Sequence, residues 1–395
     1  MKLFFYCQHS IGMGHFVRSS AMAERLSHAF DIVFLNGGPV PAGLPFPDAV
    51  ERIDLPPLGM REDATLVSLT PGLTVDEALQ RRRDQMIALL NARQPDVVLI
   101  ELFPFGRRKF ECELIPLLTA AHARGADRPL IVCSLRDLLV TARRSQQEFD
   151  DRARDLCHRF FDLVMAHTDP IFARLEDTFR PSVPLATPVE YTGFLTRDFV
   201  EQPSVDRSGV LVSAGGGHVG EPLFRAAVAA HAINWPVLQL PTTIVAGPFA
   251  PPAVVADLQT AATKGRGLTV LPQVPSLVPL LTSARASVSQ CGYNTALDLL
   301  RARVPALVVP FAEGRENEQT TRATRLAECG LLETLPSTEL TPERLAGAIR
   351  ELLDFTPARP TLDMNGAETT LRLLSDLASR RSARSQRAFA GEAVR

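Results

Sequence analysis

The chain has 395 residues, beyond the size at which one hydrophobic core usually stops growing, so two domains are expected. Hydrophobic residues make up 46% and charged residues 22%, a balance that excludes a wholly disordered chain. The formal net charge of -2 provides no global basic field, so nucleic acid is not expected as a partner.

The six cysteines are scattered, with no Cys-x-x-Cys pair and no histidine at zinc-ligand spacing, which indicates reduced thiols and a cytoplasmic protein. The apolar run after Lys2 is too short for an export signal, and no stretch reaches the length of a transmembrane helix. Arginines after Ser379 leave open a weak peripheral contact with the inner membrane face. The plainer alternative is a frayed, solvated tail. The oligomeric state stays open.

Short apolar runs alternate with helical patterns, which is typical of parallel sheets covered by helices on both faces. The first half begins with a strand and a helix at residues 16–30, where apolar residues recur at helical spacing. Residues 42–72, rich in proline and glycine, predict a long functional loop. The strands expected in this half are 2–8, 31–35, 97–101, 130–134 and 163–167.

The second half repeats the pattern, with helices expected at 221–231, 295–301 and 317–328. Its expected strands are 209–213, 243–246, 268–271, 286–289 and 306–310. We therefore predict an α/β protein with two doubly wound domains, at residues 1–195 and 208–365. Residues 196–207 form the linker, and residues 366–395 form a C-terminal helix and basic tail. Ligands of such sheets bind at the carboxyl ends of the strands, here in a cleft between the domains.

Gly12-Met13-Gly14-His15 directly follows the first predicted strand and opens a helix. The glycines permit a tight turn, and the helix N-terminus offers N–H groups and a positive dipole end to an anion. His15 is the residue type suited to general base catalysis near neutral pH. This motif alone leaves open a histidine that only completes the turn.

Ser213-Ala214-Gly215-Gly216-Gly217-His218 follows the first strand of the second half. Consecutive glycines between a strand and a helix let backbone N–H groups approach a phosphate closely. A flexible connection is the alternative. The position at the carboxyl end of a strand favours phosphate binding.

A third polar segment runs from Ser289 to Thr295 and continues into a helix that carries Asp298. A carboxylate in the first helical turn, as expected for Asp298, can accept hydrogen bonds from a ribose diol. Glu318 and Gln319, at the start of another helix, can bind sugar hydroxyls. Either acid could instead only complement a helix dipole.

Together these segments resemble the GT-B nucleotide-sugar glycosyltransferases, in particular the family 28-like group with the glucosaminyltransferase that makes the peptidoglycan lipid intermediate. The resemblance covers nearly the whole chain. It is strongest at residues 287–323, SVSQCGYNTALDLLRARVPALVVPFAEGRENEQTTRA, which is similar to the donor-binding motif of that group. Residues 101–111, ELFPFGRRKFE, also resemble a subgroup of bacterial predicted glycosyltransferases. The resemblance implies the GT-B fold, two Rossmann-like domains facing each other across a cleft.

The resemblance also implies a role for each matching residue. Asp298 replaces a glutamate that contacts the ribose hydroxyls, and Glu318 and Gln319 would contact the donor sugar. The backbone of Val274 would read the base edge. Arg197 falls where the group often has an arginine that faces the diphosphate. The Gly-Asn-Pro motif that usually stands beside this arginine is absent here. The full set of donor-binding residues is Gly14, Arg197, Ser213, Gly215, Gly216, Gly217, His218, Val274, Gln290, Gly292, Asn294, Thr295, Asp298, Glu318 and Gln319.

His15 matches a histidine that, in related inverting enzymes, deprotonates the acceptor hydroxyl while a carboxylate holds it. Glu101 is the candidate carboxylate and Asp137 the alternative, and both could simply cap turns. The implied reaction is an inverting transfer from a nucleotide-diphosphate donor, UDP-linked in this group, to a hydroxyl of a small-molecule or lipid-linked acceptor. No D-x-D motif is present, so neither a metal nor a cofactor is expected.

Two other functions stay open. The run GMGHFVRSSAMAERL also resembles the start of GT-B nucleotide-sugar hydrolases, which use water as the acceptor. A nucleotide-sugar-binding protein without catalysis is the second. A nucleotide-sugar epimerase shares the fold, but its histidine and glutamate set is not found. The sugar, the base and the acceptor are not indicated.

Overall fold

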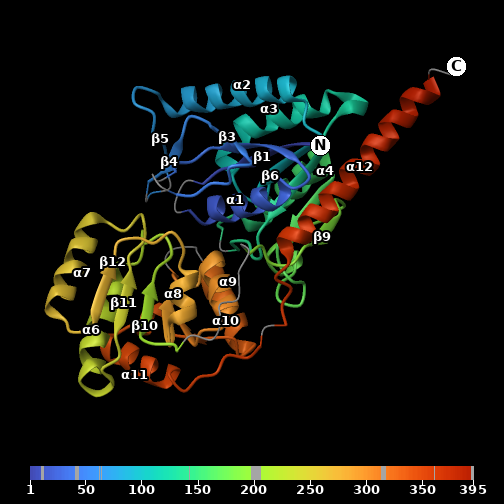
Figure 1. The fold of residues 1–395 in the computed structure, drawn as a ribbon. Coiled ribbons are helices and arrows are strands. Elements are labelled where there is room, and N and C mark those ends of the chain that lie inside the picture. Colours follow the sequence, from blue (N-terminus) through green and yellow to red (C-terminus); the bar gives the residue numbers. More distant parts are fainter. Residues whose placement is uncertain are drawn as a thin grey trace. The chain divides into compact units, whose positions relative to one another are not determined.

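The computed structural model describes residues 1–9, 13–40, 44–61, 63, 65–141, 143–196, 206–312, 317–359 and 361–392, without the side chains of 382 and 384–392. The chain divides into two compact units (Figure 1). Unit 1 comprises residues 1–139, 144–197 and 362–395, and unit 2 comprises residues 140–143 and 198–361.

Unit 1 is built on a seven-stranded parallel sheet with the order β3-β2-β1-β6-β7-β8-β9. Every strand predicted for this half is present, and the inner strands are mostly apolar and buried along nearly their whole length because helices cover both faces. The strands are β1 (Lys2–Cys7), β2 (Asp31–Asn36), β3 (Glu51–Asp54), β6 (Val97–Glu101), β7 (Leu130–Leu135), β8 (Leu163–Ala166) and β9 (Val189–Tyr191).

The helices of unit 1 pack in pairs, α2 against α3 and α1 against α12 (Figure 1). The predicted frayed tail is wrong in part, because α12 runs on to Glu392. Near the start of this helix, Glu368 forms a salt bridge with Arg25 of α1. No helix in the described ranges combines the length and apolarity needed to cross a bilayer. The helices are α1 (Gly14–Leu26), α2 (Val75–Arg93), α3 (Glu111–His122), α4 (Gln146–Phe160), α5 (Leu175–Thr178) and α12 (Gly366–Glu392).

The predicted loop at residues 42–72 is only partly irregular. Strand β3 adds to the edge of the sheet beside β2, and β4 (Leu58–Met60) pairs with β5 (Leu66–Ser68) in an antiparallel hairpin. Each strand is three or four residues long and lies among prolines and polar residues. Such short strands carry too few residues for an alternating pattern to be recognised.

Unit 2 contains a six-stranded parallel sheet with the order β12-β11-β10-β13-β14-β15. All the strands predicted for this half are confirmed, and in the register of β10 with β13 Ser213 pairs with Ser289. The strands are β10 (Val210–Ser213), β11 (Thr242–Val245), β12 (Leu268–Leu271), β13 (Ala286–Ser289), β14 (Ala306–Val308) and β15 (Glu333–Thr334).

The three helices predicted for unit 2 are confirmed with shifted ends. Helix α6 continues past the predicted end at residue 231 to Leu238, and it packs against α11 (Figure 1). The helices are α6 (Glu221–Leu238), α7 (Pro252–Lys264), α8 (Val278–Ser283), α9 (Tyr293–Ala302), α10 (Glu318–Glu328) and α11 (Pro342–Leu352).

Each unit has its own apolar core, but polar side chains are buried where the strands end. Glu101, Ser134 and His167 lie there in unit 1, and Ser213 and Ser289 lie there in unit 2. Burying such groups costs free energy unless they are hydrogen-bonded. The carboxyl edges of both sheets are therefore the places to look for a site.

Candidate functional site

His15 lies in the first turn of α1 and meets Glu101, the last residue of β6. The distance between His15 Nδ1 and Glu101 Oε1 is 2.6 Å. The contact forms because β1 pairs directly with β6, so the carboxyl ends of both strands lie at one edge of the sheet. The structure thus brings together the residues predicted as base and carboxylate partner.

Glu101 is completely buried and accepts two further charge-assisted hydrogen bonds. Arg18 Nη2 donates to Oε1 over 2.5 Å, and Arg107 Nη2 donates to Oε2 over 3.2 Å. Burial acts to raise the pKa of Glu101, but His15, Arg107 and Arg18 together hold that pKa below its ordinary value. Glu101 is therefore an ionised carboxylate.

Burial lowers the pKa of His15 well below its ordinary value, opposed by Glu101 and assisted by Arg107 and Arg136. His15 is therefore neutral near pH 7. An ionised carboxylate can only accept hydrogen bonds, so the ring proton is on Nδ1 and points at Glu101. This tautomer makes Nε2 the nitrogen that can take up a proton, as a general base must.

A fully buried histidine, His167, was missed by the sequence analysis and lies at the same sheet edge. His167 Nε2 is 2.8 Å from Ser134 Oγ, and its Nδ1 is 2.8 Å from Thr192 Oγ1. Burial, with help from Arg18, lowers the pKa of His167 well below its ordinary value. Both ring nitrogens are engaged by hydroxyls, so His167 connects the ends of β7, β8 and β9.

A buried ion pair in unit 1 also escaped the sequence analysis. Arg82 of α2 and Glu113 of α3 have fully buried side chains, joined by a 2.7 Å bond from Arg82 Nε to Oε2. Arg82 also donates to Gln8 Oε1 at 2.6 Å and to the Gly37 carbonyl at 2.8 Å. The pair therefore holds the chain just after β1 and just after β2, on the same edge as His15.

In unit 2, the glycine turn after β10 packs against the turn after β11. Gly217 has φ +87°, and a Cβ there would lie 2.1 Å from the Ala246 carbonyl oxygen. Gly247 has φ +96°, and a Cβ there would lie 2.7 Å from the Gly216 carbonyl oxygen. Only glycine combines these angles with this close approach. Gly247 was not predicted, because it stands alone in the sequence.

The start of α9 lies beside this glycine turn. Gly292 is the N-cap of α9, and a Cβ built on Gly215 would be 3.7 Å from Thr295 Oγ1. The predicted phosphate-binding residues of two separate segments therefore lie close together. They combine backbone N–H groups of glycines, a hydroxyl and the positive end of a ten-residue helix, which suits an anionic ligand.

The side chains of Gln319, Gln290 and Arg322 form hydrogen bonds that connect the neighbouring turns. Gln319 Oε1 accepts from the Cys291 N–H at 3.0 Å and from the Phe311 N–H at 3.2 Å. Gln290 Nε2 donates to the Val219 carbonyl at 3.1 Å.

Arg322 of α10, which is buried and was not predicted, donates from Nη1 to the Cys291 carbonyl at 2.8 Å. Its only sequence signal is its position three residues after Gln319 on the same helix. The turns after β13 and β14 are therefore held from α10.

The expected place of Asp298 is wrong, because α9 begins at Tyr293 rather than at residue 295. Asp298 is half-buried and lies in the second turn of α9, while Glu318 does open α10 as predicted. Gly14 begins α1, in unit 1. Arg197 lies outside the described residues.

The remaining predicted positions surround the strand ends of unit 2. His218 is exposed, and Asn294 and Val274 are half-buried. A hollow of about 290 Å³ lies between α7 and the ends of β11 and β12. Its lining residues are Gly247, Pro248, Ala250, Pro252, Val255, Ala256, Gln259, Pro272 and Gln273.

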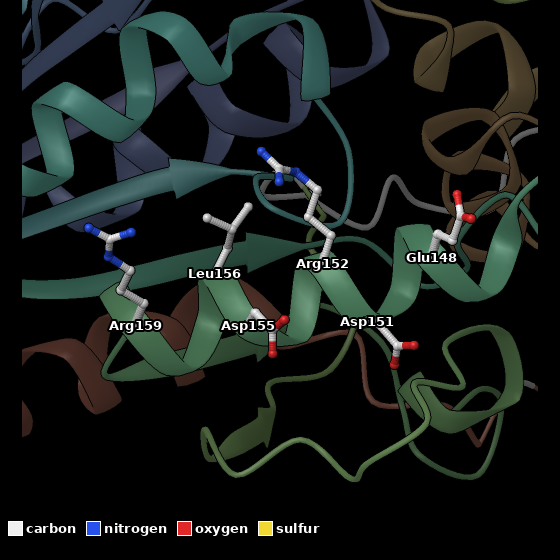
Figure 2. A pocket seen from close by; sticks show the side chains of 6 residues that line it. All are labelled: Glu148, Asp151, Arg152, Asp155, Leu156 and Arg159. Carbon is white, nitrogen blue, oxygen red and sulfur yellow. The ribbon is translucent and has the colours of Figure 1, made fainter.

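A wider hollow of about 490 Å³ follows the outer face of α4 and includes none of the predicted site residues. Figure 2 shows Leu156 pointing to the same side of the helix as the guanidinium groups of Arg152 and Arg159. Arg152 is already engaged by Glu111, and Asp151 by Ser182. The hollow is thus a charged surface groove whose groups are largely paired. Within the described ranges, no three His, Cys, Asp or Glu side chains are grouped to hold a metal ion.

One family model and several curated proteins match part of the chain. Residues 254–376 match the Glycosyltransferase family 28 C-terminal domain. The UDP-N-acetylglucosamine--N-acetylmuramyl-(pentapeptide) pyrophosphoryl-undecaprenol N-acetylglucosamine transferase of Mesorhizobium japonicum is 32% identical over 129 residues, 31% of this chain and 34% of that protein. An uncharacterized glycosyltransferase of Methanopyrus kandleri is 28% identical over 171 residues, 43% of this chain and 45% of that protein. The matches therefore span between a third and a half of these relatives.

Solved structures match over nearly the whole chain. MurG of Acinetobacter baumannii has a TM-score of 0.60 at 17% identity, covering 95% of this chain and 100% of that chain. Phytolacca americana UGT2, complexed with UDP-2fluoro-glucose and pterostilbene, has a TM-score of 0.59 at 16% identity and full coverage of both chains. The UDP-GlcNAc 2-epimerase of Methanocaldococcus jannaschii has a TM-score of 0.59 at 13% identity, covering 95% and 99%. The chain has the GT-B fold, as the sequence resemblance implied.

Proposed function

We propose that the protein is a glycosyltransferase that moves a sugar from a nucleotide-diphosphate donor, a UDP-sugar, to a hydroxyl group. The observation that carries this proposal is the neutral His15 with its Nδ1 held by the buried carboxylate of Glu101. The family 28 match supports it as well, because residues 254–376 include the segment from Ser289 to Gln319.

Unit 2 would bind the donor. The N–H groups of Gly215, Gly216 and Gly217, with the start of α9, would hold the diphosphate, since such donors are pre-arranged for an anion. Gln319 uses Oε1 to hold two backbone N–H groups, so its Nε2 would donate to a sugar hydroxyl. Asp298 would accept from the ribose.

The proposed reaction is a single displacement. His15 Nε2 takes the proton of the acceptor hydroxyl as the oxygen forms a bond to the anomeric carbon from the face opposite the diphosphate. The bond from that carbon to the diphosphate oxygen breaks, and the nucleotide diphosphate leaves with the electron pair, so the configuration inverts. Glu101 stabilises the imidazolium that forms. Backbone N–H groups rather than a metal ion would stabilise the leaving group, so chelators should not affect turnover.

The acceptor class is proposed more broadly, as a small molecule or a lipid-linked hydroxyl compound. Curated relatives that match part of the chain are named for a pyrophosphoryl-undecaprenol acceptor, which supports the lipid-linked case. All six cysteines are free thiols, which fits a cytoplasmic enzyme. A lipid-linked acceptor would bring it to the inner membrane face.

The test combines donor binding with turnover. A panel of nucleotide-sugars is screened by thermal shift, because a bound donor raises the unfolding temperature through mass action. The stabilising donor is then used in turnover assays with wild type and His15→Ala. We expect the variant to keep its donor-induced shift and to lose most of its turnover. His28→Ala, an exposed histidine just after the same helix, serves as the matched control.

Three outcomes would contradict the proposal. Wild-type turnover by His15→Ala would remove the assigned base. Release of free sugar at the same rate with and without acceptors would indicate a hydrolase. No donor turnover under any condition would leave only a binding protein.

A further inference from the structure

Arg107 is held in an unusual way beside the predicted base. Its backbone has φ +60°, in the left-handed region that arginine rarely adopts, just before the short 3₁₀ turn Arg108–Phe110. Its side chain is only 12% exposed. Residues held in such a conformation cluster at functional sites, since surrounding structure must offset the strain.

The guanidinium of Arg107 is only partly satisfied by the protein. Nη2 donates to Glu101 Oε2 over 3.2 Å, which is long for a charge-assisted bond. Nε is buried and has no hydrogen-bond partner in the described part of the chain. A buried donor left unpaired costs about 1–3 kcal/mol, more when the group is charged. Arg107 therefore has hydrogen-bonding capacity that the protein itself does not use.

Several guanidinium groups act on the pair of Glu101 and His15. Glu101 is shared with Arg18, which is nearer and buried, and Arg136 also acts on His15. A ligand oxyanion that reached this place would meet positive charge and the unused N–H donor of Arg107.

The position of Arg107 suits a ligand that approaches His15. Its charge acts on His9, His15, Tyr6 and Cys7, so the guanidinium lies near the carboxyl end of β1 and the residues that follow it. That sheet edge is where doubly wound domains bind ligands. The planar guanidinium can offer two parallel N–H groups to an oxyanion.

We infer that Arg107 forms a subsite for an oxyanion carried by the acceptor, close to the hydroxyl that His15 deprotonates. The acceptor is therefore an anionic alcohol bearing a phosphate, phosphodiester or carboxylate, rather than a neutral sugar or alcohol. The inference rests on the proposed function in that it takes His15 as the base. Arg107 selects the acceptor class, while Glu101 orients the base.

The test measures anion binding beside His15 directly. The full chain is prepared with isotope-labelled histidine, which gives eight ring signals, and the His15 signal is assigned with His15→Gln. Saturating UDP is added first, so that donor-phosphate binding cannot account for the response. Inorganic phosphate and acetate are then titrated separately to compare the two oxyanion types. We expect phosphate, acetate or both to shift the His15 signal in a saturable manner.

Arg107→Gln should weaken that binding about tenfold or more, because one charge-assisted bond contributes at least 1.4 kcal/mol. Arg107→Lys keeps the positive charge but not the two parallel N–H groups of the guanidinium, so it should give an intermediate affinity. This second variant keeps the test decisive if Arg107→Gln does not fold. Arg108→Gln, at the exposed neighbouring arginine, should bind as wild type does.

The inference is overturned if neither anion shifts the His15 signal, or if Arg107→Gln and Arg108→Gln respond alike. Failure of the proposed function looks different, because UDP would then fail to bind while phosphate or acetate still shifted the His15 signal. In matched turnover assays, wild type should prefer glycerol phosphate to glycerol as the acceptor. Arg107→Gln should lose that preference.

Discussion

Replacing Glu101 with glutamine removes the charge that holds His15 while keeping the size of the side chain. The wild-type carboxylate is fully buried and accepts from Arg18 at 2.5 Å and from Arg107 at 3.2 Å. In the variant both guanidinium groups would face a neutral amide. Removing one partner of a buried ion pair typically costs 3–5 kcal/mol, so we expect the free energy of unfolding to fall by about that amount.

The same change should affect turnover. A glutamine can still reach His15 Nδ1, but it would not stabilise the imidazolium that forms in the proposed reaction, when Nε2 takes up the acceptor proton. A positioned general base contributes roughly 10²–10⁴-fold to a rate, so we expect kcat to fall by about that range. Donor affinity should change little, since the proposed donor-binding turns belong to unit 2.

The assay pairs urea unfolding with single-turnover rates, measured at a temperature where every variant is folded. Glu113→Gln is the matched control, because Glu113 is equally buried and is paired with Arg82 at 2.7 Å. It should lose similar stability but much less rate. Equal rate losses in the two variants would refute a specific role for Glu101. So would a Glu101→Gln/His15→Ala double variant whose loss equals the product of the single losses, because residues that act as a unit are not additive.

Three further predictions concern pH, the glycine turn and the donor sugar. The folded-state pKa values of His15 and His167 lie below the ordinary 6.5, so below that pH the unfolded chain binds more protons. The free energy of unfolding should therefore fall as pH drops from about 6.5, by up to ~1.4 kcal/mol per pH unit for each histidine. A urea concentration at the unfolding midpoint that stays constant between pH 7.5 and 5 would contradict this. Gly217→Ala should destabilise unit 2 by about 1–3 kcal/mol and weaken UDP binding measured by calorimetry. The control is Gly330→Ala, because Gly330 has φ +66° but a Cβ there would make only an ordinary 3.7 Å contact. This control should lose less stability and bind UDP with unchanged affinity. Gln319→Glu keeps an oxygen that can accept from the two backbone N–H groups but loses the amide N–H group. The KM for the nucleotide-sugar should therefore rise about tenfold. An unchanged KM would show that Gln319 does not bind the sugar.

Much of the sheet could be predicted from the chain alone, because parallel strands covered on both faces read as short apolar runs. The runs at Val97–Glu101 and Ala286–Ser289 are found in the structure with the predicted bounds. Helices α2 and α4 were not predicted, because charged residues dominate both and hide their apolar positions. Strand β3 escaped because it is short and mostly exposed at the sheet edge.

The buried ionic groups could not be predicted in the same way. Arg82 and Glu113 are 31 positions apart, and each stands on a helix among other charged residues, as surface charges do. Only the packing of α2 against α3 removes both from water and makes them one pair. His167 and Arg322 were missed for the same reason, since nothing local distinguishes a buried polar side chain from an exposed one.

The sequence by itself determined the order of strands and helices along the chain, and hence which residues follow each strand. Local patterns carry that information, because burial on two sheet faces and helix capping act over a few neighbouring residues. It placed His15 after one strand and Glu101 at the end of another. Strand order in space was decided only by the tertiary structure, which set β1 directly beside β6. That pairing brings two residues 86 positions apart to 2.6 Å, because parallel neighbours present their carboxyl ends at one edge of the sheet.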